Sequence, residues 1–320
     1  MPNNSFYPIG YLGTPWTDTE KKKWFTKNTK SRSYQKNIVD NLTSLSDRFT
    51  IIQYGSLSID PDAYPLYAIK TPHWDNQKPS ILITGGVHGY ETSGVHGAIQ
   101  FMEEYAQQYR HDVNIITLPC ISPWGYEHIA RWNPYAIDPN RSFVSNSPSE
   151  EATQAMEIIA QLTSNNNIIM HIDLHETTDS DESEFRPALA ARDGKPYIAG
   201  EIPDGFYLVA DSENPQLAFQ QSIIHAVSQV THIAPADVNG EIIGSKAVSE
   251  GIICYPLRAL GLCAGMSNAL FTTTTEVYPN SAKVTADDCN HAQVTAIKAA
   301  LNYVIDDLNK NNTQINRNKI

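Results

Sequence analysis

The sequence lacks the features that mark membrane-spanning, exported and nucleotide-binding proteins. No run approaches the ~18 consecutive apolar residues of a spanning helix, and neither a Walker A motif nor a dinucleotide-binding fingerprint occurs. The amino terminus has no basic cluster followed by an apolar core, so we expect no export signal and a cytoplasmic location. Only four cysteines occur, none with C-x-x-C spacing, which predicts buried reduced thiols without metal or catalytic roles.

Basic residues are also scarce. Lys and Arg number 23 against 35 Asp and Glu, which gives a formal net charge of -12. This charge opposes nucleic acid backbones and anionic membrane surfaces, so neither is an expected partner. The 41% hydrophobic content can fill the core of one large domain. We interpret residues 1–320 as a single domain with an N-terminal surface arm (1–30) and a polar, frayed tail (310–320); the oligomeric state is not indicated.

Strand and helix patterns alternate along the chain. Residues 48–71 favour an antiparallel pair of strands, and apolar or β-branched strands are predicted at 81–84, 113–119, 167–175 and 269–277. Helical patterns are predicted near 34–47, 91–109, 150–163, 214–230 and 285–309. This order predicts a three-layer α/β fold with a mixed, mostly parallel sheet and helices on both faces. Sites in such folds lie at the carboxyl ends of the strands.

His88 and Glu91 lie where a predicted strand ends and a helix begins. A histidine and a carboxylate three residues apart can turn toward one point and bind a zinc ion. The preceding Gly85-Gly86 allows the close backbone approach that such a corner needs. Alone, the H-x-x-E spacing is equally compatible with a Glu that interacts with a helix N-terminus.

His171, Asp173 and His175 alternate along one predicted strand, so their side chains share a face. Three polar side chains on an apolar strand are costly to bury without a partner, and a metal ion would supply one. His175 is nearest the carboxyl end and is the predicted third ligand. Asp173 is predicted to orient a ligand. For His171, a hydrogen-bonded role in the core is the favoured interpretation.

Glu276 ends a strongly β-forming run that is followed by Pro279. A carboxylate in this position can accept a proton from a metal-activated water, and desolvation would raise its pKa toward the working range. Taken alone, a Glu at a strand end is usually solvated.

Four segments together resemble the zinc metallocarboxypeptidase superfamily. They read GGVHGYE, SPWGYEHIARWNPYAIDPNRSF, DLHETT and TTTTEVYP, and they occur in family order between residues 85 and 279. The first and third are most similar to the succinylglutamate desuccinylase and aspartoacylase branch. The resemblance implies a zinc-carboxypeptidase-like fold with one Zn²⁺ per chain, held by His88, Glu91 and His175, and Glu276 as general base.

The resemblance extends to the residues that would bind substrate. Asp138, Asn140 and Arg141 match the family's Asp-x-Asn-Arg block, in which Asn and Arg bind the substrate carboxylate and Asp contacts the first His ligand. Arg131 is similar to the arginine that polarises the scissile carbonyl. Tyr255 is similar in position to a substrate-binding tyrosine upstream of the base, although packing explains it equally well.

Two segments match no family pattern and are expected to set substrate selectivity. Residues 176–215 show little periodicity, which is typical of a binding-site wall, and residues 236–265 are Gly-rich and irregular. Arg186 and Arg258 lie in these segments and are candidates to contact an acidic side chain, although exposed arginines near a cleft are common.

The predicted function is zinc-dependent hydrolysis of an amide bond next to a free carboxylate, by a metallocarboxypeptidase that acts on peptides. One alternative is deacylation of N-acyl amino acids, as in the desuccinylase and aspartoacylase branch. Another is an inactive zinc- or peptide-binding module. Serine hydrolysis has less support, because Gly265-Met-Ser267-Asn-Ala269 only approximates a nucleophile elbow.

Overall fold

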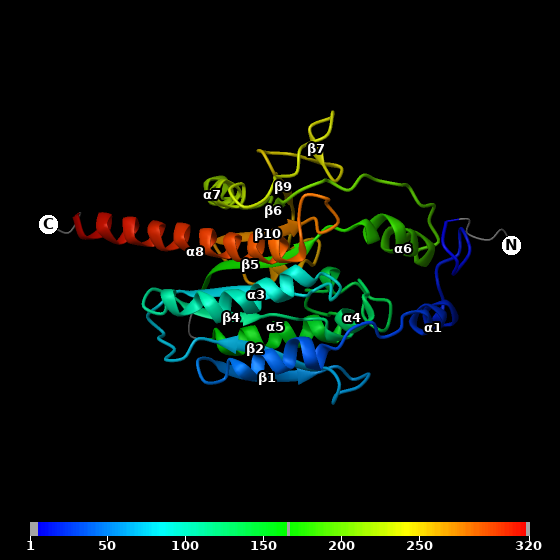
Figure 1. Cartoon of the computed structure of the whole chain (residues 1–320), viewed down its shortest axis with the longest axis horizontal. Helices are drawn as coiled ribbons and strands as arrows, with labels where there is room; N and C mark the ends of the chain where they lie inside the picture. Colours follow the sequence, from blue (N-terminus) through cyan, green and yellow to red (C-terminus); the bar gives the residue numbers. More distant parts are fainter. Residues whose placement is uncertain (1–5, 165–166, 318–320) are drawn as a thin grey trace.

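The computed structural model describes residues 6–164 and 167–317. Its central feature is a mixed eight-stranded β-sheet (Figure 1). Four of the seven pairings between neighbouring strands are parallel. In order across the sheet, the strands are β1 (Thr50–Ser56), β2 (Pro65–Lys70), β4 (Asn114–Leu118), β3 (Ser80–Gly85), β5 (Ile168–Glu176), β10 (Phe271–Val277), β6 (Tyr207–Asp211) and β9 (Ile252–Tyr255).

A two-stranded ribbon and eight α-helices complete the described part of the chain. The ribbon pairs β7 (Glu241–Ile242) with β8 (Ser245–Lys246). None of the described helices is long and apolar enough to cross a membrane. The helices are α1 (Asp18–Lys27), α2 (Asp40–Ser44), α3 (Thr92–Glu104), α4 (Pro123–His128), α5 (Glu150–Leu162), α6 (Arg186–Arg192), α7 (Leu217–Val227) and α8 (Ala286–Arg317).

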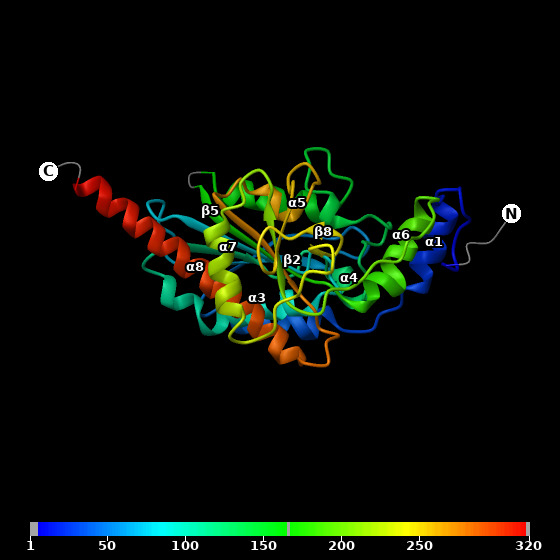
Figure 2. The same ribbon diagram turned by 90° about the horizontal axis from the view of Figure 1, so that it is seen from above.

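Helices cover both faces of the sheet. On one face α3 and α8 contact β5, and α7 packs beside α8, whereas α5 lies on the other face (Figure 2). The side chains of β3 alternate between the two sides, as the pleat requires. Ile81 and Ile83 join the core beneath α3 and α8, and Leu82 joins Ile158 and Ile159 of α5. The predicted three-layer α/β fold with a mixed, mostly parallel sheet is confirmed.

The parallel centre of the sheet brings distant parts of the chain to one edge. Strands β4, β3, β5 and β10 run in the same direction, because each pairs in parallel with its neighbour. Their carboxyl ends therefore lie together, and the segments that carry His88, Asp138, His175 and Glu276 all follow or finish these strands.

Close contacts between backbone atoms, possible only at glycines, fix the corner between β3 and α3. A Cβ atom on Gly94 would lie 2.4 Å from the carbonyl oxygen of Leu174, and one on Gly85 would lie 2.6 Å from the carbonyl oxygen of Gly94. No side chain fits at either position without movement of the backbone. The first turn of α3 therefore lies directly against β5, which places residues 86–91 beside the end of that strand.

The amino-terminal arm, predicted for residues 1–30, is mostly exposed over its described part, but a few buried aromatic side chains anchor it to the rest of the protein. Helix α1 buries Trp24, and Trp16 packs edge-to-face on Trp132 with ring centroids 6.1 Å apart. The backbone N–H of Trp16 also donates to the carbonyl of Arg192 in α6. The lysines around Trp24 indicated an exposed segment. In the structure, Trp24 packs on Trp124 of α4, and the contacts of Trp16 anchor the segment beside α6. The first five residues of the arm lie outside the described residues.

Three other predicted boundaries differ from the structure. The helix expected at 34–47 is a π-helical turn, Gln35–Val39, followed by α2. The segment 176–215 contains α6, whose Pro187 lies in the first turn where proline is tolerated, and the short strand β6. Helix α8 continues to Arg317 instead of fraying from residue 310, since no Gly or Pro ends it; residues 318–320 lie outside the described part.

Replacing Gly94 by alanine should destabilise the protein although alanine favours helix formation. The added methyl group overlaps the backbone of β5, so we expect the free energy of unfolding to fall by about 1–3 kcal/mol. Chemical denaturation measures this change. Glu103→Ala, at an exposed position of the same helix, is the control and should stay within about 0.5 kcal/mol of wild type. A gain in stability for Gly94→Ala would show that helix propensity outweighs the contact.

Candidate metal centre and cleft

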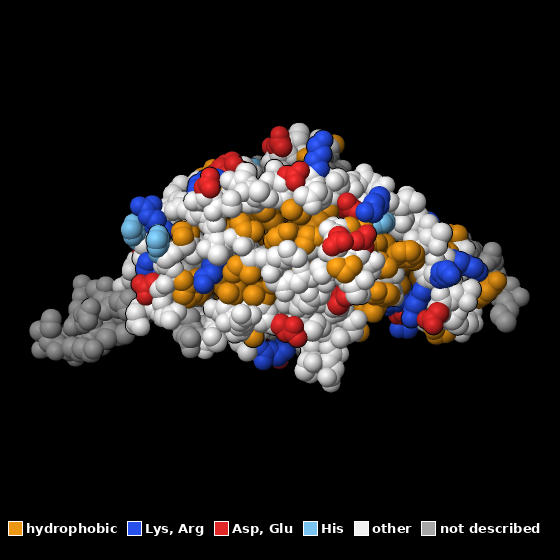
Figure 3. Space-filling model, turned by 90° about the horizontal axis from the view of Figure 1, so that it is seen from below, with side chains coloured by type: hydrophobic (Ala, Val, Ile, Leu, Met, Phe, Trp, Pro, Cys, Tyr) orange, Lys and Arg blue, Asp and Glu red, His pale blue; other side chains and the backbone are white. Residues whose placement is uncertain are grey.

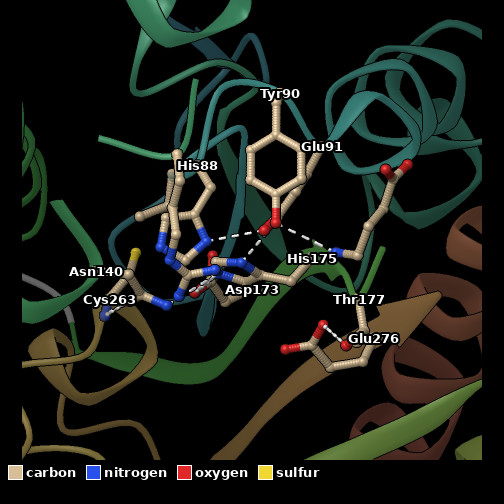
Figure 4. Close-up of polar contacts among 12 residues, drawn as sticks. His88, Tyr90, Glu91, Asn140, Asp173, His175, Thr177, Cys263 and Glu276 are labelled. Carbon is tan, nitrogen blue, oxygen red and sulfur yellow. Dashed lines mark hydrogen bonds and ion pairs between the residues drawn. The ribbon is translucent and has the colours of Figure 1, made fainter. Parts of the chain in front are cut away.

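Three side chains of the kinds that bind metal converge at the ends of β3 and β5 (Figure 4). Nδ1 of His88 lies 2.8 Å from Oε1 of Glu91, and Nδ1 of His175 lies 2.7 Å from Oε2 of the same carboxylate. One ligand atom from each residue lies within 4.8 Å of the others. All three side chains are buried, with Glu91 only 1% exposed. The structure thus brings together the three predicted ligands.

Each histidine contacts a second carboxylate, that of an aspartate, through its other ring nitrogen, Nε2. Nε2 of His88 lies 3.0 Å from Oδ1 of Asp138, and Nε2 of His175 lies 2.8 Å from Oδ2 of Asp173. An Nε2–H that donates to its aspartate leaves Nδ1 free to bind a cation, and it fixes the plane of the ring. Asp138 and Asp173 therefore occupy the orienting positions predicted for them.

The electrostatics of the cluster favour a positive charge between its members. Burial alone would lower the pKa of His175, but Asp173 and Glu91 hold it well above its usual range. Burial alone would raise the pKa of Glu91, but His175 and His88 hold it well below its usual range. A proton and a metal cation compete for Nδ1 of His175. The negative charges of Asp173 and Glu91 that stabilise the proton would also stabilise the cation. Two imidazole nitrogens and one carboxylate are a donor set that suits zinc.

A buried chain of hydrogen bonds runs from His175 to His171 along one face of β5. Oγ1 of Thr84 donates to Oδ1 of Asp173 at 2.6 Å and lies 2.9 Å from Nε2 of His171. Oγ of Ser267 lies 3.0 Å from the other nitrogen of His171. Burial lowers the pKa of His171 to about 4, so this ring is neutral at pH 7. His171 has the hydrogen-bonded role favoured from sequence, and Ser267 serves as its partner.

Glu276 lies beside the cluster on the neighbouring strand. Its Cα pairs in register with that of His175, so the two side chains leave the same face of the sheet. Oγ1 of Thr177 donates to Oε2 of Glu276 at 2.9 Å, and the hydroxyl of Tyr207 lies 2.7 Å from the same Oγ1. Burial raises the pKa of Glu276 to about 8. A cation held by the adjacent cluster would favour the charged carboxylate and lower this pKa, which suits Glu276 to accept a proton and to release it again.

A cavity of about 730 Å³, here called the central cavity, opens beside these residues. Asp138, Thr177 and Glu276 line it on the side of the cluster, and its wall is rich in arginine although the protein is acidic. The segment 176–215, predicted to form a wall, supplies α6 and part of β6 to the lining. The cationic and aromatic side chains of the lining include Lys21, Arg131, Trp132, Tyr135, Arg141, Arg186, Arg192, Tyr207 and Tyr255.

Arg131 and Arg141 differ in how their charges are balanced. Nε of Arg131 lies 3.3 Å from Asp138 and its Nη1 lies 3.2 Å from Asp181, so two carboxylates hold this guanidinium. Arg141 donates from Nη1 to the carbonyl of Asn140 at 2.7 Å and forms no ion pair with the described residues. A guanidinium that lines a cavity without an anionic partner is a ready site for a carboxylate.

The remaining predicted residues are placed as follows. Asn140 turns toward the cluster, because its Nδ2 lies 3.4 Å from Nε2 of His175 and its Oδ1 accepts from the N–H of Cys263 at 2.8 Å. Tyr255 lines the central cavity, and its hydroxyl accepts from Oγ of Ser245. Arg186 also lines the cavity and pairs with Glu182, whereas Arg258 is exposed and does not line it.

Sequence reasoning missed several residues that support the site. Asp181 holds Arg131 and accepts from the hydroxyl of Tyr90 at 3.3 Å. Arg32, from the arm region, donates to the carbonyl of Tyr90 at 3.1 Å and so holds the loop between His88 and Glu91. Thr84 could have been found from sequence. It is a polar residue in the apolar run that precedes Gly85-Gly86, and a polar side chain buried there requires a hydrogen-bond partner.

Comparison with known proteins agrees with this geometry. Residues 77–195 match the family model of the succinylglutamate desuccinylase/aspartoacylase catalytic domain. No curated protein matches the sequence. Among solved structures, a candidate metallopeptidase from Shewanella amazonensis is 20% identical with a TM-score of 0.63, over 84% of this chain and 91% of that chain.

Two further solved structures carry the same fold. A metallo-carboxypeptidase from Pseudomonas aeruginosa, in complex with (2-guanidinoethylmercapto)succinic acid, is 12% identical with a TM-score of 0.57, over 86% of this chain and 69% of that chain. Carboxypeptidase A from Helicoverpa armigera is 15% identical with a TM-score of 0.55, over 86% and 73%. The predicted resemblance and the carboxypeptidase-like fold are confirmed. Together, the fold and the family match support a metal-dependent hydrolase.

The hydroxyl of Thr84 should contribute to metal binding through Asp173 and His175. Thr84→Val keeps the shape of the side chain but removes the donor to Asp173, so we expect zinc affinity to fall about 10- to 100-fold. Competition with a chromophoric chelator measures this affinity. Thr117→Val is the matched control, because Thr117 is buried on the adjacent strand β4 and its hydroxyl has no partner in the part of the chain described. Equal affinity in both variants would show that the Thr84 contact has no role in binding.

Proposed function

We propose that this protein is a zinc-dependent hydrolase that cleaves an amide bond next to a free carboxylate, as a metallocarboxypeptidase that acts on peptides. The observation that carries the proposal is the arrangement around the central cavity. The cluster of His88, Glu91 and His175 adjoins a cavity lined by Glu276 and by Arg141, whose guanidinium forms no ion pair with the described residues. One site therefore combines metal ligands, a proton acceptor and an anchor for a carboxylate.

The residues of the chain have distinct tasks in this mechanism. A zinc ion held by the cluster would polarise the amide carbonyl and lower the pKa of a water molecule. Glu276 accepts the proton of the attacking water and delivers it to the departing amine. Arg131, fixed between Asp138 and Asp181, presents a rigid positive charge to the developing oxyanion.

Substrate binding is assigned to residues that lie beside the cluster or line the central cavity. Arg141 binds the free carboxylate, with Asn140 beside it, and Tyr255 contacts the adjacent part of the substrate. Asp138 and Asp173 hold the two imidazole rings in the orientation that binds metal. The donor set also suits cobalt, nickel or manganese, so zinc is proposed on ligand chemistry.

A second function is favoured by the family match at residues 77–195. In this alternative the substrate is an N-acyl amino acid, and the acyl group takes the place of the peptide. The relative from Pseudomonas aeruginosa is bound to a succinic acid derivative, which agrees with a carboxylate ligand for either function. A panel that contains peptides, N-succinyl-glutamate and N-acetyl-aspartate separates the two, because only one substrate class should reach high kcat/KM.

Metal content and turnover should respond differently to variants of His175 and Glu276. Wild type is expected to hold about one zinc per chain, His175→Ala to lose most of it, and Glu276→Gln to keep it while kcat falls about 10²- to 10⁴-fold. Elemental analysis and peptide hydrolysis measure the two effects. His225→Ala, an exposed histidine on α7, is the control and should match wild type. Undiminished hydrolysis by Glu276→Gln would remove the assignment of the base, and full metal in His175→Ala would remove that ligand.

Arg141 should matter only for substrates that end in a free carboxylate. We expect Arg141→Met to lower kcat/KM on such a peptide by about 10²-fold, as for loss of one partner of a desolvated charge pair. Amidation of the peptide should lower the wild-type rate similarly, and the two changes should not add. Arg258→Met is the control, because this arginine is exposed and lies off the cavity lining. Additive losses would show that Arg141 and the carboxylate do not meet.

A further inference from the structure

A second hollow of about 480 Å³ adjoins the central cavity on the side of α1. Its lining combines the charged side chains of Asp18, Lys21 and Lys22 with five apolar ones, and we call it the apolar hollow after the latter. These are Phe25, Ile59, Pro134, Tyr135 and Ile137. They come from α1, from the connection between β1 and β2, and from the loop that leads to Asp138.

The two hollows are neighbours that share part of their lining. Lys21, Tyr135 and Ile137 line both the central cavity and the apolar hollow. The loop that forms part of the apolar hollow also runs directly into Asp138, which contacts His88. The apolar hollow therefore lies next to the cavity that Asp138 and Glu276 also line.

Contacts within the protein hold the walls of the apolar hollow in place. Phe25 stacks on Trp124, with ring centroids 5.7 Å apart and planes 13° from parallel. The hydroxyl of Tyr135 lies 3.3 Å from Oγ of Ser58, and the backbone N–H of Tyr135 donates to Oδ1 of Asn133 at 3.0 Å. A preformed apolar hollow loses little conformational entropy when a ligand enters it.

Two large side chains in the apolar hollow are exposed to solvent. Ile59 is 38% exposed and Tyr135 is 45% exposed. In Figure 3, hydrophobic side chains are visible near the Lys and Arg side chains at the end of the molecule that carries α1. Apolar surface gathered in a hollow beside a cleft is typical of ligand-binding surface.

We propose that the apolar hollow binds an apolar side chain of a peptide substrate, upstream of the scissile amide bond. This inference rests on the proposed function, in which Arg141 binds the carboxyl-terminal residue and the rest of the peptide passes along the central cavity. The lining that the two hollows share at Lys21, Tyr135 and Ile137 favours this occupant, because a peptide in the central cavity would lie beside the apolar hollow. An N-acyl amino acid has no chain beyond the acyl group to fill the apolar hollow, so the substrate class is a peptide with an aromatic or branched aliphatic residue before its carboxyl-terminal end.

Paired peptides test the proposal. Each pair ends in the same two residues and carries either Phe or Ser at one of the three preceding positions. We expect kcat/KM of zinc-loaded wild type to be about tenfold higher for the Phe peptide at one of these positions, as burial of one apolar side chain predicts. Ile59→Ser and Tyr135→Ala should each bring that ratio toward one. Val230→Ser is the matched control, since Val230 is 37% exposed and lies off both hollows, and it should keep the wild-type ratio.

A ratio near one in wild type at all three positions would overturn the apolar hollow as a substrate site, and so would a ratio that both hollow variants retain. If zinc-loaded wild type cleaves none of the peptides, the proposed function fails. Calorimetric binding of the same Phe and Ser peptides to zinc-loaded protein then decides the inference separately, because a hollow that binds substrate still prefers Phe. A wild-type dimer that dissociates in Ile59→Ser would instead assign the surface to a second copy of the chain and overturn the proposal.

Discussion

A single buried carboxylate bridges the two histidines on which the site depends. Both oxygens of Glu91 face imidazole nitrogens, and only 1% of its surface reaches solvent. A charged group in that position is very unfavourable unless positive partners surround it, so His88 and His175 are required beside Glu91. The rest of the architecture serves this requirement. Because Gly85 and Gly94 have no side chains, the backbone of α3 can lie directly against β5. This places Glu91, the residue before the helix, at the end of that strand.

The aspartates that contact the two histidines are also charged, and their negative charge has to be compensated. Asp138 orients His88 but would add an uncompensated negative charge, and Arg131 compensates it. Arg131 is shared with Asp181, and this makes one rigid ionic network of the loop after β4 and the turn before α6. On the other side, Asp173 is satisfied by His175 and by Thr84. The aspartate behind each histidine is therefore balanced differently. Ion pairs balance Asp138 beside His88 at the cleft, and a hydrogen bond from Thr84 balances Asp173 beside His175 in the core.

The parts of the site that sequence predicted are those with strong local signals. His88 and Glu91 follow a glycine pair, and His175 ends a strand with clear alternation, so their positions at one edge of the sheet follow from the fold class. Asp181 and Arg32 gave no such signal, because their roles arise from contacts with Arg131 and with the carbonyl of Tyr90 that only the folded chain creates. The aromatic contacts that anchor the arm were not predicted for a similar reason, since nothing local in its Lys-rich sequence indicates which surface Trp16 and Trp24 pack against.

The place of β10 in the sheet has a consequence for how the protein is made. This strand is the last in the chain, yet it pairs between β5 and β6 near the middle of the sheet, and it carries Glu276. During synthesis, the segments that hold the three ligands leave the ribosome long before the strand that joins the two parts of the sheet. A nascent chain that ends before β10 has the candidate metal ligands without Glu276. The candidate site is thus completed only when β10 joins the sheet, and this last step requires contacts that are distant in sequence.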